Sequence, residues 1–118
     1  PTPRPTATMS EPAPQPTKLR MYILVREAVP TGFAILAAAH ASLAAYLKYQ
    51  NTPEVAEWLS GPFFKTVCRV SEEEFARAKE TPDHVVITES ALDGQEVAIA
   101  FKPRAEYPKA FRFLKLYR

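Results

Sequence analysis

Hydrophobic positions divide the chain into segments with a two-residue period and segments with a helical period. Both faces of residues 19–26 are apolar, which is typical of a strand that is covered on both sides and therefore central in its sheet. The turn dipeptide Asp93-Gly94 separates two further alternating segments and predicts an antiparallel hairpin. The remaining strand-like segments, including the two of the hairpin and a last edge segment, are 64–70, 84–89, 96–101 and 113–117.

A helical period covers residues 31–49, where seven alanines between Ala34 and Ala45 favour helix by propensity. At about 100° per residue, one stripe of this helix collects most of its large apolar side chains. The stripe contains Phe33, Leu36, Ala37, His40, Leu43, Ala44 and Leu47. We therefore expect this face to be buried, with His40 in the middle of the most apolar surface, where an imidazole costs free energy unless it finds a partner.

Two shorter helices have clear start signals. Thr52 is an N-cap residue followed by Pro53 at the first helical position, and Ser71 and Glu74 have the spacing of a capping box. The resulting order β-α-α-β-α-β-β predicts an α/β protein with helices packed on a mixed four-stranded sheet, or a five-stranded sheet if the last segment pairs.

The predicted domain is single and covers residues 18–118. Residues 1–17 hold six of the twelve prolines and almost no large apolar side chains, so they are predicted to be a disordered tail.

The single cysteine excludes an internal disulfide, and no apolar run has the character of a membrane span, so we expect a cytoplasmic protein without membrane contact. The three glycines are far apart, which excludes a glycine-rich nucleotide loop, and one cysteine with two histidines gives no zinc spacing. We expect neither a metal nor a cofactor.

The net charge of +2 is unevenly distributed. Residues 71–96 hold eight acids against two bases, whereas residues 102–118 hold six bases against Glu106 alone. Aromatic side chains alternate with the bases in this second segment, a pattern compatible with binding a phosphate backbone. A solvated amphipathic edge is the alternative interpretation.

His40 is the main candidate for chemistry. The hairpin supplies hydroxyls and carboxylates that could meet it, namely Thr88, Glu89, Ser90 and Asp93. An imidazole oriented by a carboxylate can act as a general base towards water. A satisfied core histidine is the alternative interpretation.

The segment Leu24–Gly32, followed by Ala37–Tyr46 with its Ala-Ala-Ala-His-Ala-Ser sequence, resembles the opening of the type-II peptidyl-tRNA hydrolases of archaea and eukaryotes. Phe64–Val70 looks like the lysine- and valine-rich second strand of that family, and Leu114–Tyr117 matches its usual chain end. The resemblance covers roughly residues 18–118 with the same order of elements.

The resemblance implies hydrolysis of the ester between a peptide and tRNA without a required metal, with His40 and Arg26 in the site. This chain departs from the family in two places. The lysine at the start of the family's long helix is absent from Gly32–Leu36, and the family's Gln-Asp-Ala-Gly-x-Thr segment is replaced by Thr88–Gly94. Loss of that cation weakens the binding of a polyanion or the stabilisation of an oxyanion.

The leading hypothesis is a peptidyl-tRNA hydrolase in which His40, paired with Glu89 or Asp93, positions or deprotonates water. Ser90 or Thr88 would orient the carbonyl. The bases expected to contact tRNA phosphates are Lys102, Arg104, Lys109 and Arg112. Two alternatives remain: a catalytically silent module that binds tRNA, another RNA or the ribosome, and a protein-interaction domain. A homodimer also remains open.

Overall fold

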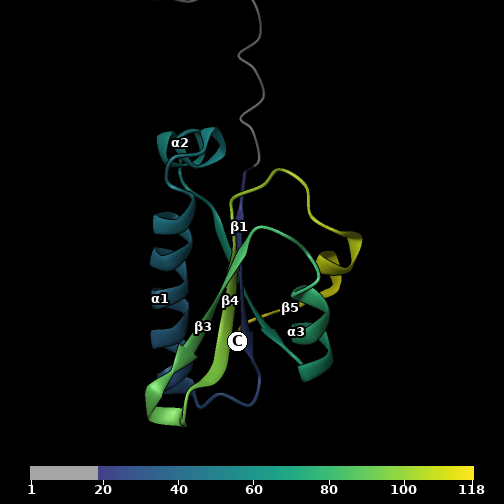
Figure 1. The fold of residues 1–118 in the computed structure, drawn as a ribbon. Helices are drawn as coiled ribbons and strands as arrows, with labels where there is room; N and C mark the ends of the chain where they lie inside the picture. The colour runs from purple at the N-terminus through teal and green to yellow at the C-terminus, as the bar shows by residue number, and fades with distance from the viewer. Residues whose placement is uncertain (1–18) are drawn as a thin grey trace, which may run out of the picture.

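The structure is a computed structural model and describes residues 19–118, so the predicted tail at 1–17 lies outside the described residues. A mixed five-stranded sheet forms its centre, in the order β3-β4-β1-β2-β5 (Figure 1). Only the β1–β2 pair is parallel; the other three pairs are antiparallel. The strands are β1 Met21–Arg26, β2 Lys65–Val70, β3 His84–Glu89, β4 Gln95–Phe101 and β5 Lys115–Leu116. The predicted α/β class is confirmed, and the last segment does pair.

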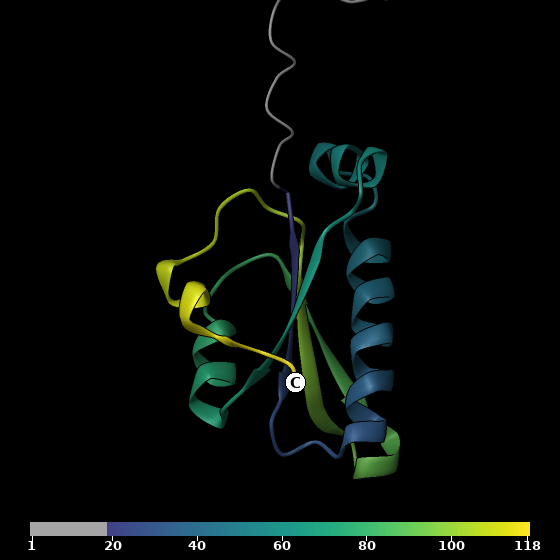
Figure 2. The ribbon, with the colours of Figure 1, turned by 180° about the vertical axis from the view of Figure 1, so that it is seen from behind.

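Helices cover both faces of the sheet. The long helix α1, Thr31–Tyr49, lies along one face, whereas α3, Glu72–Ala78, and the 3₁₀ helix η3, Lys109–Phe113, lie on the other (Figures 1 and 2). Helix α2, Pro53–Ser60, follows the C-terminal end of α1, and the 3₁₀ helix η2, Ser90–Leu92, lies in the β3–β4 hairpin. The sheet therefore separates two surfaces with different coverings.

The predicted local signals are confirmed. The Thr52 side chain accepts the Val55 N–H at 3.4 Å. In the capping box, Ser71 N–H donates to Glu74 Oε1 at 2.8 Å, and Glu74 N–H donates to Ser71 Oγ at 3.1 Å. Asp93 and Gly94 have φ values of 56° and 73°, the left-handed conformation that tight hairpin turns require.

Strand β1 is central and buried on both faces, as its two-sided apolar pattern predicts. Met21, Ile23 and Val25 contribute to the core under α1. Leu24 contributes to the second core, under α3 and η3, with Tyr22 packed against it. This two-residue alternation decides which face of the sheet each neighbouring side chain reaches.

The buried face of α1 is not the one predicted. Its buried residues are the alanines Ala34, Ala37, Ala41 and Ala45. Most of the large side chains of the predicted stripe are exposed instead, with His40 exposed and Leu36, Leu43 and Leu47 at 41%, 57% and 53% exposure, whereas Ala37 belongs to both stripes and is buried. The four alanines form a helical stripe of their own, and their small side chains let α1 lie close to the large side chains of the sheet. The expectation that His40 occupies the buried face is wrong for this reason.

Candidate nucleic-acid interface

The five bases predicted to contact substrate have different environments in the structure. Arg26, at the end of β1, forms an ion pair with Glu72 of α3, with Nη2 at 2.8 Å from Oε1 and Nε at 3.0 Å from Oε2. Its Nη1 also donates to the carbonyl of Glu96. Because this bidentate contact with the Glu72 carboxylate satisfies the guanidinium, Arg26 links β1 to α3.

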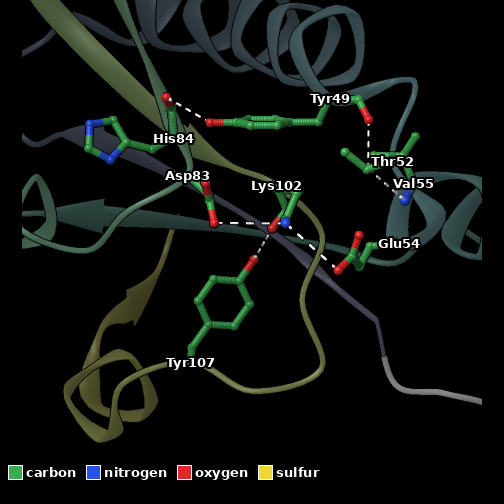
Figure 3. A network of polar contacts seen from close by, with 8 residues as sticks. All are labelled: Tyr49, Thr52, Glu54, Val55, Asp83, His84, Lys102 and Tyr107. Carbon is green, nitrogen blue, oxygen red and sulfur yellow. Dashed lines mark hydrogen bonds and ion pairs between the residues drawn. The ribbon is translucent and has the colours of Figure 1, made fainter.

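Lys102 is also engaged inside the protein. It lies just after β4 with a side chain only 18% exposed, and its Nζ is 3.8 Å from both Glu54 Oε2 and Asp83 Oδ2 (Figure 3). Its backbone N–H donates to the Asp83 carbonyl at 2.9 Å. This lysine therefore links α2, the turn before β3 and the end of β4, and two carboxylates already balance its charge.

The other three bases line one cleft. Arg104, Lys109 and Arg112 meet there with Arg20, which precedes β1. The cleft has a volume of about 480 Å³, and its remaining lining residues are Tyr22, Ala105, Glu106 and Tyr107. We call this site the basic cleft. Four cationic side chains against the single carboxylate of Glu106 give it a positive potential that attracts anions.

Arg104 is the residue around which the basic cleft is built. Its backbone exchanges two hydrogen bonds with Arg20, at 3.0 and 3.1 Å, and its guanidinium lies over the Tyr107 ring at 5.1 Å from the centroid. Its Nη1 atom is buried and has no hydrogen-bond partner within residues 19–118. A buried charged donor without a partner costs free energy, and an anion bound in the cleft beside the guanidinium would lower that cost.

Tyr107 forms a rigid wall of the basic cleft. Its hydroxyl lies 2.8 Å from the Arg20 carbonyl and 3.1 Å from the Lys102 carbonyl, and it accepts the Tyr22 N–H at 3.4 Å. Burial raises the pKa of Tyr107 well above its usual value, so the phenol stays neutral. The cleft thus gains no negative charge from this group at physiological pH.

His40 has no partner of the predicted kind. Within the described part of the chain, no hydrogen bond or ion pair joins its imidazole to Glu89, Asp93 or any other residue. The Glu89 carboxylate instead accepts the Ala91 N–H at 3.1 Å and caps η2. Ser90 is the first residue of that 3₁₀ helix, and Thr88 is exposed at the register shift of the hairpin.

The tip of the β3–β4 hairpin lies beside the start of α1 (Figures 1 and 2). His40 is nine residues along α1 from Thr31, which corresponds to roughly 14 Å along the helix axis. The basic cleft lies across the sheet, among residues that flank the second core. The structure therefore brings Arg104, Lys109 and Arg112 together, and places His40 on the opposite face.

Arg20 and Tyr107 were missed as site residues from the sequence. The two-residue alternation of β1 could have indicated Arg20. Arg20 is two residues before Tyr22 and four before Leu24, so it lies on the same face of the sheet, away from α1. Its Nη1 donates to Thr66 Oγ1 at 2.8 Å, which fixes the side chain beside β2. The alternation of aromatic side chains and bases included Tyr107, but its contacts with Arg20 and Tyr22 join segments more than eighty residues apart and could not be read from that pattern.

Other kinds of site receive no support from the described residues. No group of three or more His, Cys, Asp or Glu side chains among them could hold a metal ion. Burial, with a smaller contribution from Glu74, raises the pKa of the Cys68 thiol to about 11, so this cysteine is not an activated nucleophile. None of the helices between residues 19 and 118 combines the length and apolar character needed to cross a bilayer.

Fold and cleft together define an α/β protein with a basic cleft on one face of a mixed sheet. Comparison with known proteins adds no family to this description, since neither a protein-family model nor a curated protein sequence matches the chain.

Proposed function

We propose that this protein binds RNA through the basic cleft, as a module related to the type-II peptidyl-tRNA hydrolases it resembles. The observation that carries the proposal is the gathering of four cationic side chains in one cleft against a single carboxylate, with the buried Arg104 Nη1 left without a partner among residues 19–118. Guanidinium groups are the preferred protein donors to phosphate oxygens. The class of ligand, RNA and in particular tRNA, rests on the sequence resemblance.

The arrangement of the cations supports a polyanion. Lys109 and Arg112 belong to the surface 3₁₀ helix η3, whereas Arg20 and Arg104 pair at the end of the sheet where β1 begins and β4 ends. Cations spread over two elements can contact successive phosphates of one strand. Because each phosphate contact releases counterions, such binding weakens steeply with salt.

The test is a salt titration of tRNA affinity, measured by fluorescence anisotropy on the full chain. The double substitution Lys109→Gln/Arg112→Gln removes two predicted phosphate contacts at the surface and leaves Arg104 in place. It is expected to weaken binding at least about tenfold and to reduce the slope of log affinity against log salt by about 1 to 2.

The matched control removes two lysines on the α1 side of the sheet. Lys48 belongs to α1, and Lys65 pairs in register with Met21, whose side chain lies in the core under α1. Lys48→Gln/Lys65→Gln lowers the net charge by the same amount and is expected to keep the salt slope. Equal losses in both double variants, or no tRNA binding by the wild type, would overturn the proposal.

Ester hydrolysis of peptidyl-tRNA is the second candidate function. The exposed and unpaired imidazole of His40 favours it, because substrate and water can reach the side chain. The assay is release of tRNA from an N-blocked aminoacyl-tRNA. We expect His40→Ala to abolish any activity found, and an unchanged rate in a folded variant would exclude this role.

A further inference from the structure

The surface of α1 that faces away from the sheet is apolar and uncharged. Leu36, Leu43 and Leu47 are 41%, 57% and 53% exposed, and Ile35 is 69% exposed. No Asp, Glu, Lys or Arg occurs between Thr31 and Leu47. An exposed apolar surface of this length, without charges to solvate it, is typical of an interaction site.

The exposed residues have the spacing of a coiled-coil seam. Leu36, His40, Leu43 and Leu47 follow one another at intervals of four, three and four residues, which is the alternation of d and a positions. The alanine stripe that packs on the sheet lies on another side of the helix. The seam is therefore available while α1 keeps its contacts with the sheet.

We propose that a second copy of this chain covers this seam, with the two α1 helices antiparallel. A twofold axis passing between residues 41 and 42 places Leu36 opposite the partner's Leu47 and His40 opposite the partner's Leu43. Every a position then meets a d position, and the small side chains of Ala39 and Ala44 flank the seam on its two sides. Small flanking side chains let the two helices approach closely, as they do where α1 packs on its own sheet.

Self-complementarity and the lack of charge together select a second copy over another partner. An isologous interface must match itself under a twofold axis, and this seam does so in all four of its layers. A charged peptide or a nucleic acid would find no opposite charge on it. The four seam residues of one copy therefore match the same four residues of a second copy, and no other residue is needed for the fit.

The area of the seam sets the strength of the dimer. A helix of nineteen residues is about 28 Å long. A contact strip roughly 10 Å wide along it covers on the order of 300 Å² per copy, less than the roughly 800 Å² of a standard stable interface. The dimer is accordingly weak and dependent on concentration. It is also independent of the basic cleft, which lies across the sheet.

His40 is the weak layer of this seam. Its imidazole faces the partner's Leu43, and a polar group that loses water against leucine weakens the contact. Packing that covers His40 also withholds it from substrate. Dimer formation would thus oppose ester hydrolysis at His40 and leave RNA binding in the basic cleft unchanged.

Sedimentation equilibrium of the full chain over a range of concentrations tests the dimer. Leu43→Lys is expected to make the protein monomeric at every concentration, because it places a charge in two layers of the seam. His40→Leu is expected to tighten the dimer by at least about tenfold. The matched control is Phe113→Lys, at a side chain that is 81% exposed on η3, and it leaves the dimer unchanged.

Disulfide trapping tests the register. In a Cys68→Ser background, a mixture of Leu36→Cys and Leu47→Cys chains is expected to form a covalent dimer under mild oxidation, whereas either variant alone is not. A monomeric wild type at the highest concentration, a dimer that survives Leu43→Lys, or trapping of Leu36→Cys with itself would each overturn the proposal.

Discussion

The two faces of the sheet are built from different side chains and present different chemistry to solvent. Under α1 the helix contributes alanines to the core, and the surface above it carries leucines and no charge before Lys48. Under α3 and η3 the core includes Phe75, Phe101 and Phe111, and the surface beside it holds the basic cleft. The domain thus has an apolar face, to which we assign self-association, and a charged face, to which we assign a polyanion.

The aromatic layer explains how the basic cleft keeps its shape. The Tyr22 and Tyr107 ring centroids are 4.6 Å apart with the rings edge to face, and Tyr107 stacks on Phe111 at 5.2 Å. Phe101 of β4 contacts Phe111 at 5.2 Å. Such ring pairs add stabilisation beyond the area that they bury. Rigid rings beneath Arg104 hold its guanidinium in position before any ligand binds.

The largest expected effect comes from removing the centre of the aromatic layer. Phe111 is buried and contacts three other rings, so Phe111→Ala is expected to lower the free energy of unfolding by about 3 to 5 kcal/mol. Urea denaturation measures the change. Phe113→Ala, two residues away at an exposed position, is the control and should have an effect below about 0.5 kcal/mol. Equal losses would show that η3 does not form the aromatic core.

On the α1 face, the sharpest test enlarges a buried alanine. Ala37→Leu forces α1 away from the sheet and is expected to cost about 1 to 3 kcal/mol of unfolding free energy. Ala39→Leu makes the same change on the exposed side of the helix and is expected to be tolerated. Thermal unfolding of both variants measures the two changes in stability. A larger loss of unfolding free energy for Ala39→Leu would mean that the leucine face is the buried one.

A smaller effect is expected from a single hydroxyl. Tyr107→Phe leaves the Arg20 and Lys102 carbonyls without this donor and is expected to cost about 1 to 2 kcal/mol of unfolding free energy. The control is Tyr46→Phe, at a half-buried ring on the α1 face. If the Tyr107 hydroxyl also positions Arg104, tRNA affinity falls with the first substitution and stays constant with the second. Equal unfolding free energies for both variants would contradict this role.

Local patterns predicted most of the fold. Thr52, Pro53 and the Ser71–Glu74 box act through neighbouring backbone atoms, and the two-sided apolar run of β1 follows from its central place in the sheet. The burial of α1 could not be settled in this way, because the helix offers an alanine stripe and a leucine stripe with the same period. Which of the two packs on the sheet depends on the size of side chains contributed by other strands.

The candidate site was less predictable because it also depends on side chains from segments that are distant in the sequence. The charge pattern predicted a basic segment at residues 102–118, and the structure brings its Arg104, Lys109 and Arg112 to one cleft. It could not show that Lys102 and Arg26 are balanced by Glu54, Asp83 and Glu72, since these acids lie far away in the sequence. Assigning His40 and the C-terminal bases to one site required knowing which face of the sheet each reaches.

Hydrogen–deuterium exchange of the full chain, with and without tRNA, tests the division between the two faces most directly. We expect tRNA to slow exchange at residues 104–113, which include Arg104 and η3, and to leave the exchange of α1 unchanged. Slower exchange along α1 around His40, with no change at residues 104–113, would contradict this expectation.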